Sequence, residues 1–575
     1  MAWTNEDVAR QFAEITTLLK LSGADPFRVR AYERATGAIG AATADVSTLD
    51  DAALAALKGV GASTARKIRE YLDTGRIGML EQLRAAVPPV LVELTRIPGV
   101  GPKTARLIHD ALRVDSLEAL RDAIAAERLR ELPGLGAKTE ANLREAIARI
   151  GAKDTGRVPM ANAIAIAEEL CARLARLRGV RRVAYAGSLR RMRETVGDVD
   201  LLVAADDPAP VHAALRACDL VTGVLAAGEA KTSVLTRAGL QADLRVVHPD
   251  AYGAALVYFT GSKAHNVRIR ERAVRRGLTL NEYGLFDRAS GERVAGRTEA
   301  EVYGALGMAY VPPPLREDTG EVEAAVAGTL PPVVTLADVR GDLHGHSDWS
   351  GDGKATLEEM VAGAAARGHR YWAVTDHAED LPLNGLSRAR MLERRAAIAA
   401  LADRYDVRIL EGAELNIGPD GAVDYDPEFL ASFDFCVASV HTLMRRPRAD
   451  QTARIVAAMR HPSVTAIGHL TGRIIGRREP YDVDLDAVLE AALETGTALE
   501  VNASPRRLDL SGEMVRRAVD AGVTLTISCD AHSVGDLASM RYGVATAQRG
   551  WATAADVLNC RELPELREFV AAKRA

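Results

Sequence analysis

The sequence predicts a multidomain protein in which a helical first part is followed by a mixed α/β part and then by a parallel βα part. Three observations predict this fold class. Short helical stretches joined by glycine turns fill the first 150 residues, strand patterns begin near residue 158, and from residue 340 short apolar strands alternate with helical stretches. At 575 residues the chain is too long for one hydrophobic core, so three to five domains are expected.

The composition is that of a globular protein, with 48% hydrophobic and 26% charged residues. The first residues, MAWTNEDVAR, lack the basic and apolar regions of a signal peptide, and no apolar run reaches membrane-spanning length. The five cysteines contain no CxxC pair, which fits a reducing compartment. We therefore expect a cytoplasmic protein with no membrane partner.

Charge divides unevenly along the chain. The net charge of −5 alone argues against a nucleic-acid partner. Residues 1–300, however, contain 44 Lys and Arg against 37 Asp and Glu, whereas residues 301–575 contain 29 against 41. A mildly basic first half joined to an acidic second half weakly indicates two functions with different partners.

Three turns in the helical part share the pattern apolar-x-Gly-apolar-Gly. They are LKGVGAST (57–64), IPGVGPKTA (97–105) and LPGLGAKTE (132–140). Glycines permit the tight turn and bring backbone N–H groups to the surface, where a helix N-terminus binds a phosphate oxygen. One copy would equally suit a plain glycine-capped hairpin. Three copies favour binding to the DNA backbone, as in the helix-hairpin-helix of DNA-repair proteins that the motif resembles, through Gly59, Gly61, Gly99, Gly101, Gly134 and Gly136.

Two carboxylates stand at the start of an apolar strand in GSLRRMRETVGDVDLLV (187–203). Residues two apart in a strand point to the same face, so Asp198 and Asp200 can hold one or two divalent ions together. Paired buried carboxylates usually share a cation, because an isolated charge is costly in low dielectric. A third carboxylate, Asp243 in LQADLRVV, would complete a site for two metal ions. For the two-residue motif alone, solvated acids at a loop end are the alternative.

The turn before these carboxylates suits a phosphate tail. Gly187 and Ser188 follow the strand RRVAYAG and begin a short helix, and Arg190, Arg191 and Arg193 supply positive charge nearby. Of the three arginines, we expect Arg191 to meet a triphosphate.

GSLRRMRETVGDVD, ADLR and YFTGSKAHNVRIR occur in one order and together resemble the family X DNA polymerases, the group of DNA polymerase beta, over about residues 1–315. The resemblance implies that Asp198 and Asp200 bind both metals, Mg²⁺ or Mn²⁺, and that Asp243 binds the catalytic one. It also implies substrates, which are dNTPs and gapped or nicked DNA. The nucleotide-binding residues that it implies are Gly187, Ser188, Arg191, Gly197, Tyr258, Phe259, Gly261, Asn266 and Arg270.

Two lysines lie in segments that resemble the family. Lys263 replaces an acidic residue of the beta enzyme, so it could reach the incoming nucleotide or be a solvated lysine at a helix start. The segment GVGASTARKIREYLDTG aligns Lys67 with the Schiff-base lysine of the family's deoxyribose-phosphate lyase domain. Ser63 replaces the family's companion lysine, and phosphate contact is the alternative role for Lys67.

Eight of the twelve histidines follow residue 340, most of them at strand ends. A single such histidine is more often structural, but nine N/O ligands at the carboxyl ends of parallel strands have little structural explanation. Imidazole with carboxylate suits zinc, manganese or iron, nine ligands would serve three ions, and clustered metals promote phosphoester hydrolysis. The nine are His344, His346, Asp352, His377, Glu414, His441, His469, Asp530 and His532.

From the residues alone, the βα alternation predicts a parallel barrel or a doubly wound sheet. The ligand motifs resemble the PHP (polymerase and histidinol phosphatase) domain over about residues 338–575, which implies a distorted (β/α)7 barrel. With both resemblances, the expected parts are a lyase-like helical domain (1–80), a helix-hairpin-helix domain (81–157), a nucleotidyltransferase palm (158–250), a nucleotide-selecting thumb (251–315), a linker (316–337) and the PHP phosphoesterase (338–575).

The leading interpretation is a bacterial family X polymerase that fills gaps in DNA repair and whose PHP domain is a metal-dependent 3′–5′ exonuclease. AP-site incision, 3′-phosphate removal and lyase activity are compatible with the same motifs. The alternatives are a metabolite phosphoesterase with an inactive polymerase module and a non-catalytic DNA-end scaffold. A monomer is expected, and the sequence leaves the native PHP metals open.

Overall fold

The computed structural model of the chain describes residues 5–40, 46–47, 49–57, 59–95, 100–136, 139–140, 143, 157–381 and 384–575. The chain forms two compact units, Met1–Arg157 and Val158–Ala575, and each is considered by itself. Of the predicted site residues, Gly99 in the second hairpin lies outside the described residues.

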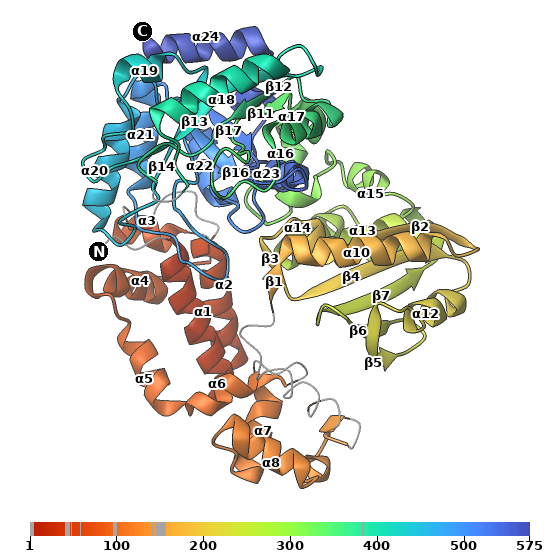
Figure 1. The fold of residues 1–575 in the computed structure, drawn as a ribbon. Coiled ribbons are helices and arrows are strands. Elements are labelled where there is room, and N and C mark those ends of the chain that lie inside the picture. The colour runs from red at the N-terminus through yellow and green to blue at the C-terminus, as the bar shows by residue number, and fades with distance from the viewer. Residues whose placement is uncertain are drawn as a thin grey trace. The chain divides into compact units, whose positions relative to one another are not determined.

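Short helices joined by turns make up the first unit, as the sequence predicts (Figure 1). Their apolar faces bury one core that includes Phe12, Ile15 and Ile68. Gly61 and Gly101 are the residues immediately before two of the helices. The helices are α1 (Asn5–Leu21), α2 (Pro26–Gly40), α3 (Asp51–Ala56), α4 (Ala62–Thr74), α5 (Gly78–Ala86), α6 (Pro89–Thr95), α7 (Pro102–Leu112) and α8 (Leu117–Ala125), followed by the 3₁₀ turn η1 (Leu129–Glu131).

The palm begins the second unit with a five-stranded sheet of order β2-β4-β7-β6-β5. Its neighbours are antiparallel except β4 and β7, which run parallel. The strands are β2 (Val180–Tyr185), β4 (Asp198–Ala205), β5 (Val221–Ala227), β6 (Thr232–Thr236) and β7 (Gln241–Val247), and β1 (Val158–Pro159) pairs separately with β3 (Thr195–Val196). The palm helices are α10 (Met160–Ala175), α11 (Gly187–Arg190) and α12 (Ala209–Arg216).

Both faces of β4 are covered, which explains its continuous apolar run. Leu201 and Val203 pack in the core that contains α10. Leu202 and Ala204 point the other way and pack against the first thumb helix, α13 (Tyr252–Thr260). Asp198 and Asp200 share the alternation of Leu202, so they start the strand on the face that α13 covers.

The thumb combines helices with a small antiparallel sheet. Its core gathers Val257 of α13, Ile269, Leu285 and Tyr303 from four elements. The remaining elements are the turn η2 (Pro249–Ala251), α14 (Lys263–Arg275), β8 (Leu278–Asn281), β9 (Gly284–Asp287), β10 (Arg293–Ala295), α15 (Glu299–Ala305) and the turn η3 (Pro313–Leu315).

The segment 316–337, expected to be a linker, contains the helix α16 (Glu321–Ala327) and the start of the turn η4 (Leu336–Asp338). Val322 and Ala325 pack into the thumb core. Glu321 is fully buried, with its Oε1 2.6 Å from His265 Nδ1. The proline-bounded, acidic stretch is therefore packed against its neighbours, because its helix has an apolar face.

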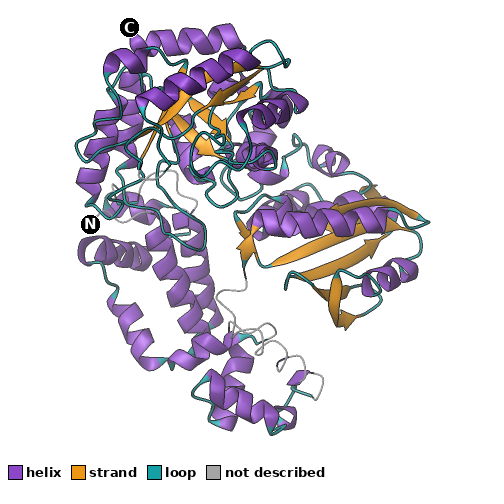
Figure 2. Cartoon of the chain, viewed as in Figure 1, coloured by secondary structure: helices purple, strands orange, loops and turns teal. Residues whose placement is uncertain are grey.

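The last part is a sheet of seven parallel strands in chain order with helices around it, and this confirms the predicted (β/α)7 barrel (Figure 2). Backbone hydrogen bonds from Asp530 N to His344 O (3.0 Å) and from His346 N to Ala531 O (2.8 Å) join the segments after the first and last strands, so the barrel is nearly closed. The strands are β11 (Gly341–Asp342), β12 (Tyr371–Val374), β13 (Arg408–Asn416), β14 (Phe435–Ser439), β15 (Ala466–Ile467), β16 (Ala498–Asn502) and β17 (Leu525–Ser528).

Helix α24 (Leu563–Arg574) covers one end of the barrel (Figure 1). Its Leu566 and Val570 pack with Tyr371 and Phe435, which begin two strands. The amino ends of the strands are thus covered by apolar packing, and polar chemistry is left to the carboxyl ends. The other helices are α17 (Leu357–Ala366), α18 (Arg388–Leu401), α19 (Pro427–Ala431), α20 (Arg448–Met459), α21 (Leu485–Thr495), α22 (Gly512–Ala521) and α23 (Met540–Arg549), with the turns η5 (Asp536–Ser539), η6 (Ala554–Asp556) and η7 (Leu558–Cys560). Among the described residues, no helix has the length and apolar character to cross a bilayer.

Candidate active sites of the palm and the barrel

The three palm carboxylates lie on the two parallel strands of the sheet. Asp198 and Asp200 begin β4, and Asp243 on β7 is the register partner of Asp200. Lys231 Nζ lies 2.5 Å from Asp243 Oδ2, and Gln241 Nε2 donates to Asp243 Oδ1 at 2.9 Å. The structure therefore brings all three predicted carboxylates together and adds a lysine that the sequence reading missed.

Negative charge accumulates at this point of the palm. Burial raises the pKa of the Asp200 carboxyl to about 7, and the charges of Asp198 and Asp243 add to the shift. A bound cation would remove this penalty, because it offsets the repulsion among the carboxylates. The donor set, which consists of carboxylate oxygens alone, is one that Mg²⁺ and Mn²⁺ favour.

Glycine is required where the chain passes the carboxylates. Gly187 has a positive φ of 64°, and a Cβ atom there would lie 2.2 Å from Asp200 Oδ2. Any side chain at this position would displace the carboxylate. Ser188 follows in α11, and Gly197 is exposed immediately before β4.

Arg191 connects this turn to the thumb. Its Nη1 donates to Thr260 O at 2.5 Å and its Nε donates to Glu317 Oε1 at 3.0 Å. Gly261, which follows α13, has a φ of 71°, and a Cβ atom there would lie 3.1 Å from Arg191 Nη1. The predicted triphosphate arginine thus lies against the end of the predicted sugar-binding segment.

The remaining predicted nucleotide residues surround the end of α13 and the start of α14. Tyr258 and Phe259 make an edge-to-face contact with centroids 5.0 Å apart. Asn266 is buried, and its Nδ2 donates to Tyr258 O at 2.6 Å. The main-chain carbonyl of Asn266 accepts from Arg270 Nε at 3.2 Å. Lys263 is the exposed first residue of α14.

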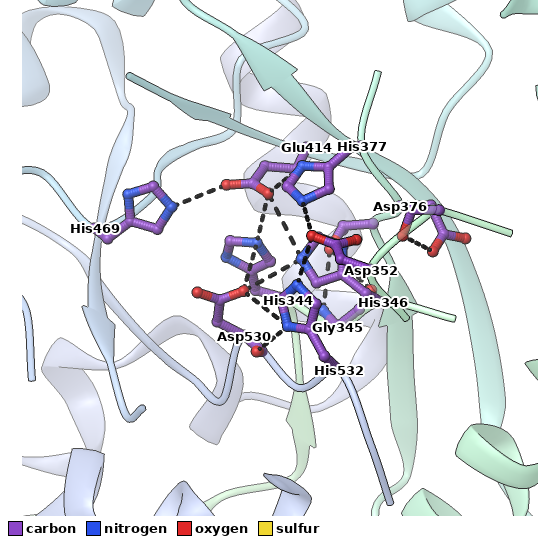
Figure 3. Close-up of polar contacts among 12 residues, drawn as sticks. His344, Gly345, His346, Asp352, Asp376, His377, Glu414, His469, Asp530 and His532 are labelled. Carbon is purple, nitrogen blue, oxygen red and sulfur yellow. Dashed lines mark hydrogen bonds and ion pairs between the residues drawn. The ribbon is translucent and has the colours of Figure 1, made fainter. Parts of the chain in front are cut away.

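The nine predicted barrel ligands converge at the carboxyl ends of the strands, and Figure 3 labels all of them except His441. His344, His346 and Asp352 follow β11, and His377 follows β12. Glu414 lies in β13, and the others follow later strands, with His441 after β14, His469 after β15, and Asp530 and His532 after β17. The topology collects residues up to 188 positions apart, because every parallel strand ends at the same side of the barrel.

Ligand atoms of these residues form three groups, within each of which all atoms lie within 4.8 Å of one another. His346 belongs to two groups and His377 to two, so the groups adjoin. His469 is outside the three groups, but its Nε2 lies 3.0 Å from Glu414 Oε1. The groups are His346, Asp352, His377 and His532; His344, His346 and Asp530; and His377, Glu414 and His441.

Two of the ligands are held in the forms that bind metal. Others are not, because Glu414 and Asp352 overcome the effect of burial and raise the pKa of His377 to about 10, so a metal would have to displace that proton. Burial alone would raise the pKa of Glu414, yet His441 and the neighbouring imidazoles hold it well below its usual range. Burial and the adjacent His532 and His377 lower the pKa of His346 to about 4, so its imidazole is neutral near pH 7. Neutral imidazoles and ionised carboxylates are the forms that bind metal.

Buried polar atoms that lack well-directed hydrogen bonds point to the same conclusion. Among the described residues, these atoms are His346 Nδ1 and Nε2, His344 Nε2 and Glu414 Oε2. Their neighbours are other ligand atoms of the cluster, since Glu414 Oε2 lies 2.9 Å from His377 Nδ1 and His346 Nε2 lies 3.2 Å from Asp530 Oδ1. Buried polar atoms are normally satisfied, and a cluster of exceptions needs an explanation. The donor set of imidazole and carboxylate fits Zn²⁺, Mn²⁺ or Fe²⁺.

Outer residues fix the orientation of two of the imidazoles. Glu500 Oε1 lies 2.7 Å from His344 Nδ1, and Asn416 Oδ1 lies 2.8 Å from His441 Nδ1. Such contacts leave the Nε2 atom of each histidine directed to the metal cluster. Sequence reasoning missed both residues, although Asn416 lies two residues after Glu414 in β13 and Glu500 is an acidic residue among the apolar residues Ala498, Leu499 and Val501 of β16.

An arginine borders the cluster. Arg507 Nε lies 3.4 Å from Asp530 Oδ2, and its buried Nη1 has no hydrogen-bond partner among the described residues. With burial, Arg507 lowers the pKa of His469 to about 3. It brings positive charge to the mouth of a barrel that lies in the acidic half of the chain, and sequence reasoning missed it.

In the first unit, the hairpin glycines leave open space around them. A Cβ atom at Gly61, Gly101, Gly134 or Gly136 would meet nothing within 4 Å, whereas one at Gly59, where φ is 105°, would lie 3.3 Å from a backbone oxygen. Lys67 Nζ donates to Ser63 O at 3.1 Å and to Ser63 Oγ at 3.0 Å, so it rests on the first turn of its own helix.

Comparisons with known proteins cover most of the chain. Family models match residues 3–77 (helix-hairpin-helix domain), 91–149 (SAM-like helix-hairpin-helix tandem), 255–317 (DNA polymerase beta thumb) and 342–504 (PHP domain). Two relatives that match part of the chain are named probable phosphatases. The one from Caldicellulosiruptor saccharolyticus is 28% identical over 34% of this chain and 82% of its own length. The one from Thermoanaerobacter sp. (strain X514) is 27% identical over 40% and 95%.

A further relative extends over the whole chain. The DNA polymerase/3′–5′ exonuclease PolX of Bacillus subtilis (strain 168) is 37% identical over 569 residues, which are 98% of this chain and 99% of that protein. Identity at this level over the full length of both chains shows common descent of all the parts together. The chain therefore belongs to the family X DNA polymerases that carry a PHP domain.

Proposed function

We propose that the protein is a DNA-directed DNA polymerase that fills gaps during DNA repair, and that its PHP domain is a metal-dependent 3′–5′ exonuclease. The observation that carries the proposal is the presence of two separate ligand sets, three carboxylates on β4 and β7 and nine imidazoles and carboxylates in the barrel. The B. subtilis relative is named for both activities. The cysteines are free, which supports a cytoplasmic location.

In the palm, Asp198, Asp200 and Asp243 would hold Mg²⁺ or Mn²⁺, which supplies positive charge to an attacking 3′-hydroxyl and a departing pyrophosphate. The raised pKa of Asp200 supports this role, since the carboxylates repel one another without a cation. One of the three aspartates would also ease deprotonation of the primer 3′-hydroxyl.

Nucleotide selection would take place at the end of α13. Arg191, Gly187, Ser188 and Gly197 would bind the triphosphate, and Tyr258, Phe259 and Gly261 would form the wall of the sugar pocket. The exposed Arg270 and the buried Asn266 would face the minor-groove side of the new base pair. Lys263 would reach the nucleotide, which its exposed position at the start of α14 permits.

The first unit would hold gapped or nicked DNA. The open space around Gly61, Gly101, Gly134 and Gly136 supports contact between their backbone amides and phosphates. Lys67 stays a candidate for the Schiff-base lysine of a deoxyribose-phosphate lyase. Its contact with Ser63 occupies two of its three donors, and a lyase would have to release them.

In the barrel, the nine ligands would hold three ions, Zn²⁺, Mn²⁺ or Fe²⁺, which supply a hydroxide at neutral pH and stabilise charge on phosphorus. Glu500 and Asn416 would fix the orientation of His344 and His441. Arg507 would bind a phosphate oxygen of the DNA 3′ end, since its Nη1 is buried and unpaired.

A second activity in the barrel is removal of a 3′-phosphate. The specific observation that favours it is the match of part of the chain to two proteins named probable phosphatases. Monoester and diester hydrolysis would draw on the same hydroxide that the ions would supply, and they differ mainly in the leaving group.

One duplex with a short gap tests the proposal. The strand that ends at the gap carries a 5′ label, and the wild-type protein is given Mn²⁺ with or without dNTPs. We expect extension to the end of the gap with dNTPs and stepwise shortening without them. A protein that leaves the labelled strand intact in both reactions, while hydrolysing small phosphomonoesters, would be a metabolite phosphatase. Binding without any chemistry would indicate a DNA-end scaffold.

A further inference from the structure

An arginine of the barrel reaches the turn that carries Arg191. Arg549 is the last residue of the barrel helix α23. Its Nη1 donates to Glu317 Oε1 at 3.0 Å and to the main-chain carbonyl of Arg191 at 3.0 Å. Arg191 Nε donates to the same Glu317 Oε1, also at 3.0 Å. One carboxylate oxygen therefore lies between an arginine of the palm and an arginine of the barrel.

The three groups are shielded from solvent. The side chains of Arg191, Arg549 and Glu317 are 13%, 14% and 18% exposed. Burial would raise the pKa of Glu317, but Arg549, Arg191 and Arg193 lower it, so the carboxylate stays ionised. Charge pairs in such surroundings are stronger than surface pairs, and losing one partner leaves the other without compensation.

The geometry sets up a competition for Arg191. Its Nε holds Glu317 and its Nη1 holds Thr260 O, which ends α13 beside Gly261. A triphosphate must attract the same guanidinium away from Glu317. While Arg549 is present, Glu317 keeps a close cationic partner after Arg191 turns to the phosphate. Without Arg549, the next cation is Arg193, whose Nη1 is 4.0 Å from Glu317 Oε1.

We propose that Arg549 of the PHP barrel is a positioning residue of the polymerase site, because it keeps Glu317 compensated and so makes Arg191 available to the incoming nucleotide. The inference rests on the proposed function in one respect, the assignment of Arg191 to the triphosphate. Its consequence is that the barrel contributes to nucleotide binding through a contact that is separate from its own metal cluster.

Other contacts hold α23 against the palm, so removing Arg549 should leave the domains docked. Tyr542 of α23 packs in the palm core with Leu508. Arg541 Nη1 lies 2.7 Å from Glu168 Oε1, and Arg473 Nη2 lies 2.6 Å from Glu194 Oε1. The Arg541–Glu168 pair is a matched control, because it also joins α23 to a palm glutamate but lies at the surface.

The test is steady-state gap filling by the full-length protein at varied dNTP concentration. Arg549→Ala should raise the KM for dNTP about tenfold and change kcat less than about twofold, since an uncompensated buried carboxylate then competes for Arg191. Arg549→Lys should give an intermediate KM, because an ammonium compensates charge but lacks the planar fork. Exonuclease activity should be unchanged in both variants, and Arg541→Ala should leave the KM at the wild-type value.

The double variant Arg549→Ala with Glu317→Gln gives the sharper result. Removing the competing charge should bring the KM for dNTP back to within about twofold of that of Glu317→Gln alone. An unchanged KM in Arg549→Ala, or no recovery in the double variant, would overturn the inference. Arg191→Ala separates this from failure of the proposed function, since a normal KM in Arg191→Ala would remove the assignment of Arg191 itself.

Discussion

Asp200 on β4 lies directly opposite Asp243 on β7, in the parallel pair of the palm sheet. Burial and the charges of Asp198 and Asp243 raise the pKa of Asp200 to about 7. Lys231 Nζ, 2.5 Å from Asp243 Oδ2, offsets part of this charge. Such an accumulation of buried carboxylates costs stability unless a cation compensates it, which supports the proposed binding of divalent ions here.

Asp200→Ala should abolish nucleotide addition, with a loss of several orders of magnitude, because one carboxylate of a two-metal site both binds and places the ions. Primer extension on gapped DNA measures the loss, and fluorescence anisotropy should show unchanged DNA binding. Asp206→Ala is the control, since Asp206 forms a surface pair with Arg181 at the other end of β4. Near-normal extension by Asp200→Ala would rule out the assignment.

Asn416→Ala should weaken the barrel's metal binding and its nuclease activity about 10- to 100-fold, because His441 loses the group that fixes its ring orientation. The loss should be recovered at high Mn²⁺ and less well at high Mg²⁺, since imidazole ligands disfavour the harder ion. Titration of nuclease activity with each ion measures this. A loss that no Mn²⁺ concentration recovers would mean that Asn416 supports the fold instead.

Glu299→Gln should destabilise the thumb in a way that depends on pH. Glu299 accepts from Arg190 and from the fully buried Arg316, both at 2.7 Å. Burial opposes ionisation, but the two arginines lower the pKa of Glu299 to about 2 from the usual 4.5. A depressed carboxyl pKa means that the pairs stabilise the fold fully above about pH 4.5 and that this contribution is lost as the pH falls toward 2.

Thermal unfolding of wild type and Glu299→Gln between pH 3 and pH 7 measures this difference. At pH 7 the free energy of unfolding of Glu299→Gln should be about 3 kcal/mol lower than that of wild type. Below pH 4.5 this difference between the two proteins should become smaller. Glu292→Gln, at an exposed position, should have the same free energy of unfolding as wild type throughout this pH range. If the difference in free energy of unfolding between wild type and Glu299→Gln stays constant from pH 7 to pH 3, the lowered pKa of Glu299 is contradicted.

DNA binding by the first unit should weaken steeply with salt and show little sequence preference, because amides and cations meet phosphates. Lys103, exposed in the first turn of α7 after Gly101, should contribute to this dependence. Lys103→Ala should reduce the slope of log affinity against log salt by about one. Arg76→Ala should not, because it removes an exposed charge beyond the carboxyl end of α4, and the hairpin turn precedes the other end of that helix. Equal slopes for wild type and Lys103→Ala would argue against a phosphate contact there.

The barrel and the convergence of its nine candidate ligands could be predicted because both follow from local pattern and topology. Each ligand lies in or just after a short apolar strand, or in the loop that follows one, and parallel strands deliver their carboxyl ends to one place. The proximity of Asp200 and Asp243 could be predicted for a similar reason, because each lies in a segment whose apolar residues predict a strand.

Residues whose role depends on distant partners could not be predicted. Glu317 lies in a stretch that reads as a linker, and its partner Arg549 is 232 residues away. Lys231 belongs to no recognisable sequence motif. Its contact with Asp243 forms only because β6 pairs with β7. Nothing local distinguishes such residues from solvated charges.

The central claim is that polymerisation and exonuclease activity use separate sites. The most direct test is to measure whether one labelled DNA strand is extended or shortened at its 3′ end. Asp200→Ala and His344→Ala are each given Mn²⁺, dNTPs and the same gapped duplex, in matched and mismatched form, with folding checked by circular dichroism. Asp200→Ala should shorten the strand without extending it, and His344→Ala should extend the matched end without shortening either. If folded His344→Ala still shortens the end, the barrel is not the nuclease. If either variant loses both activities to the same extent, the sites are not independent.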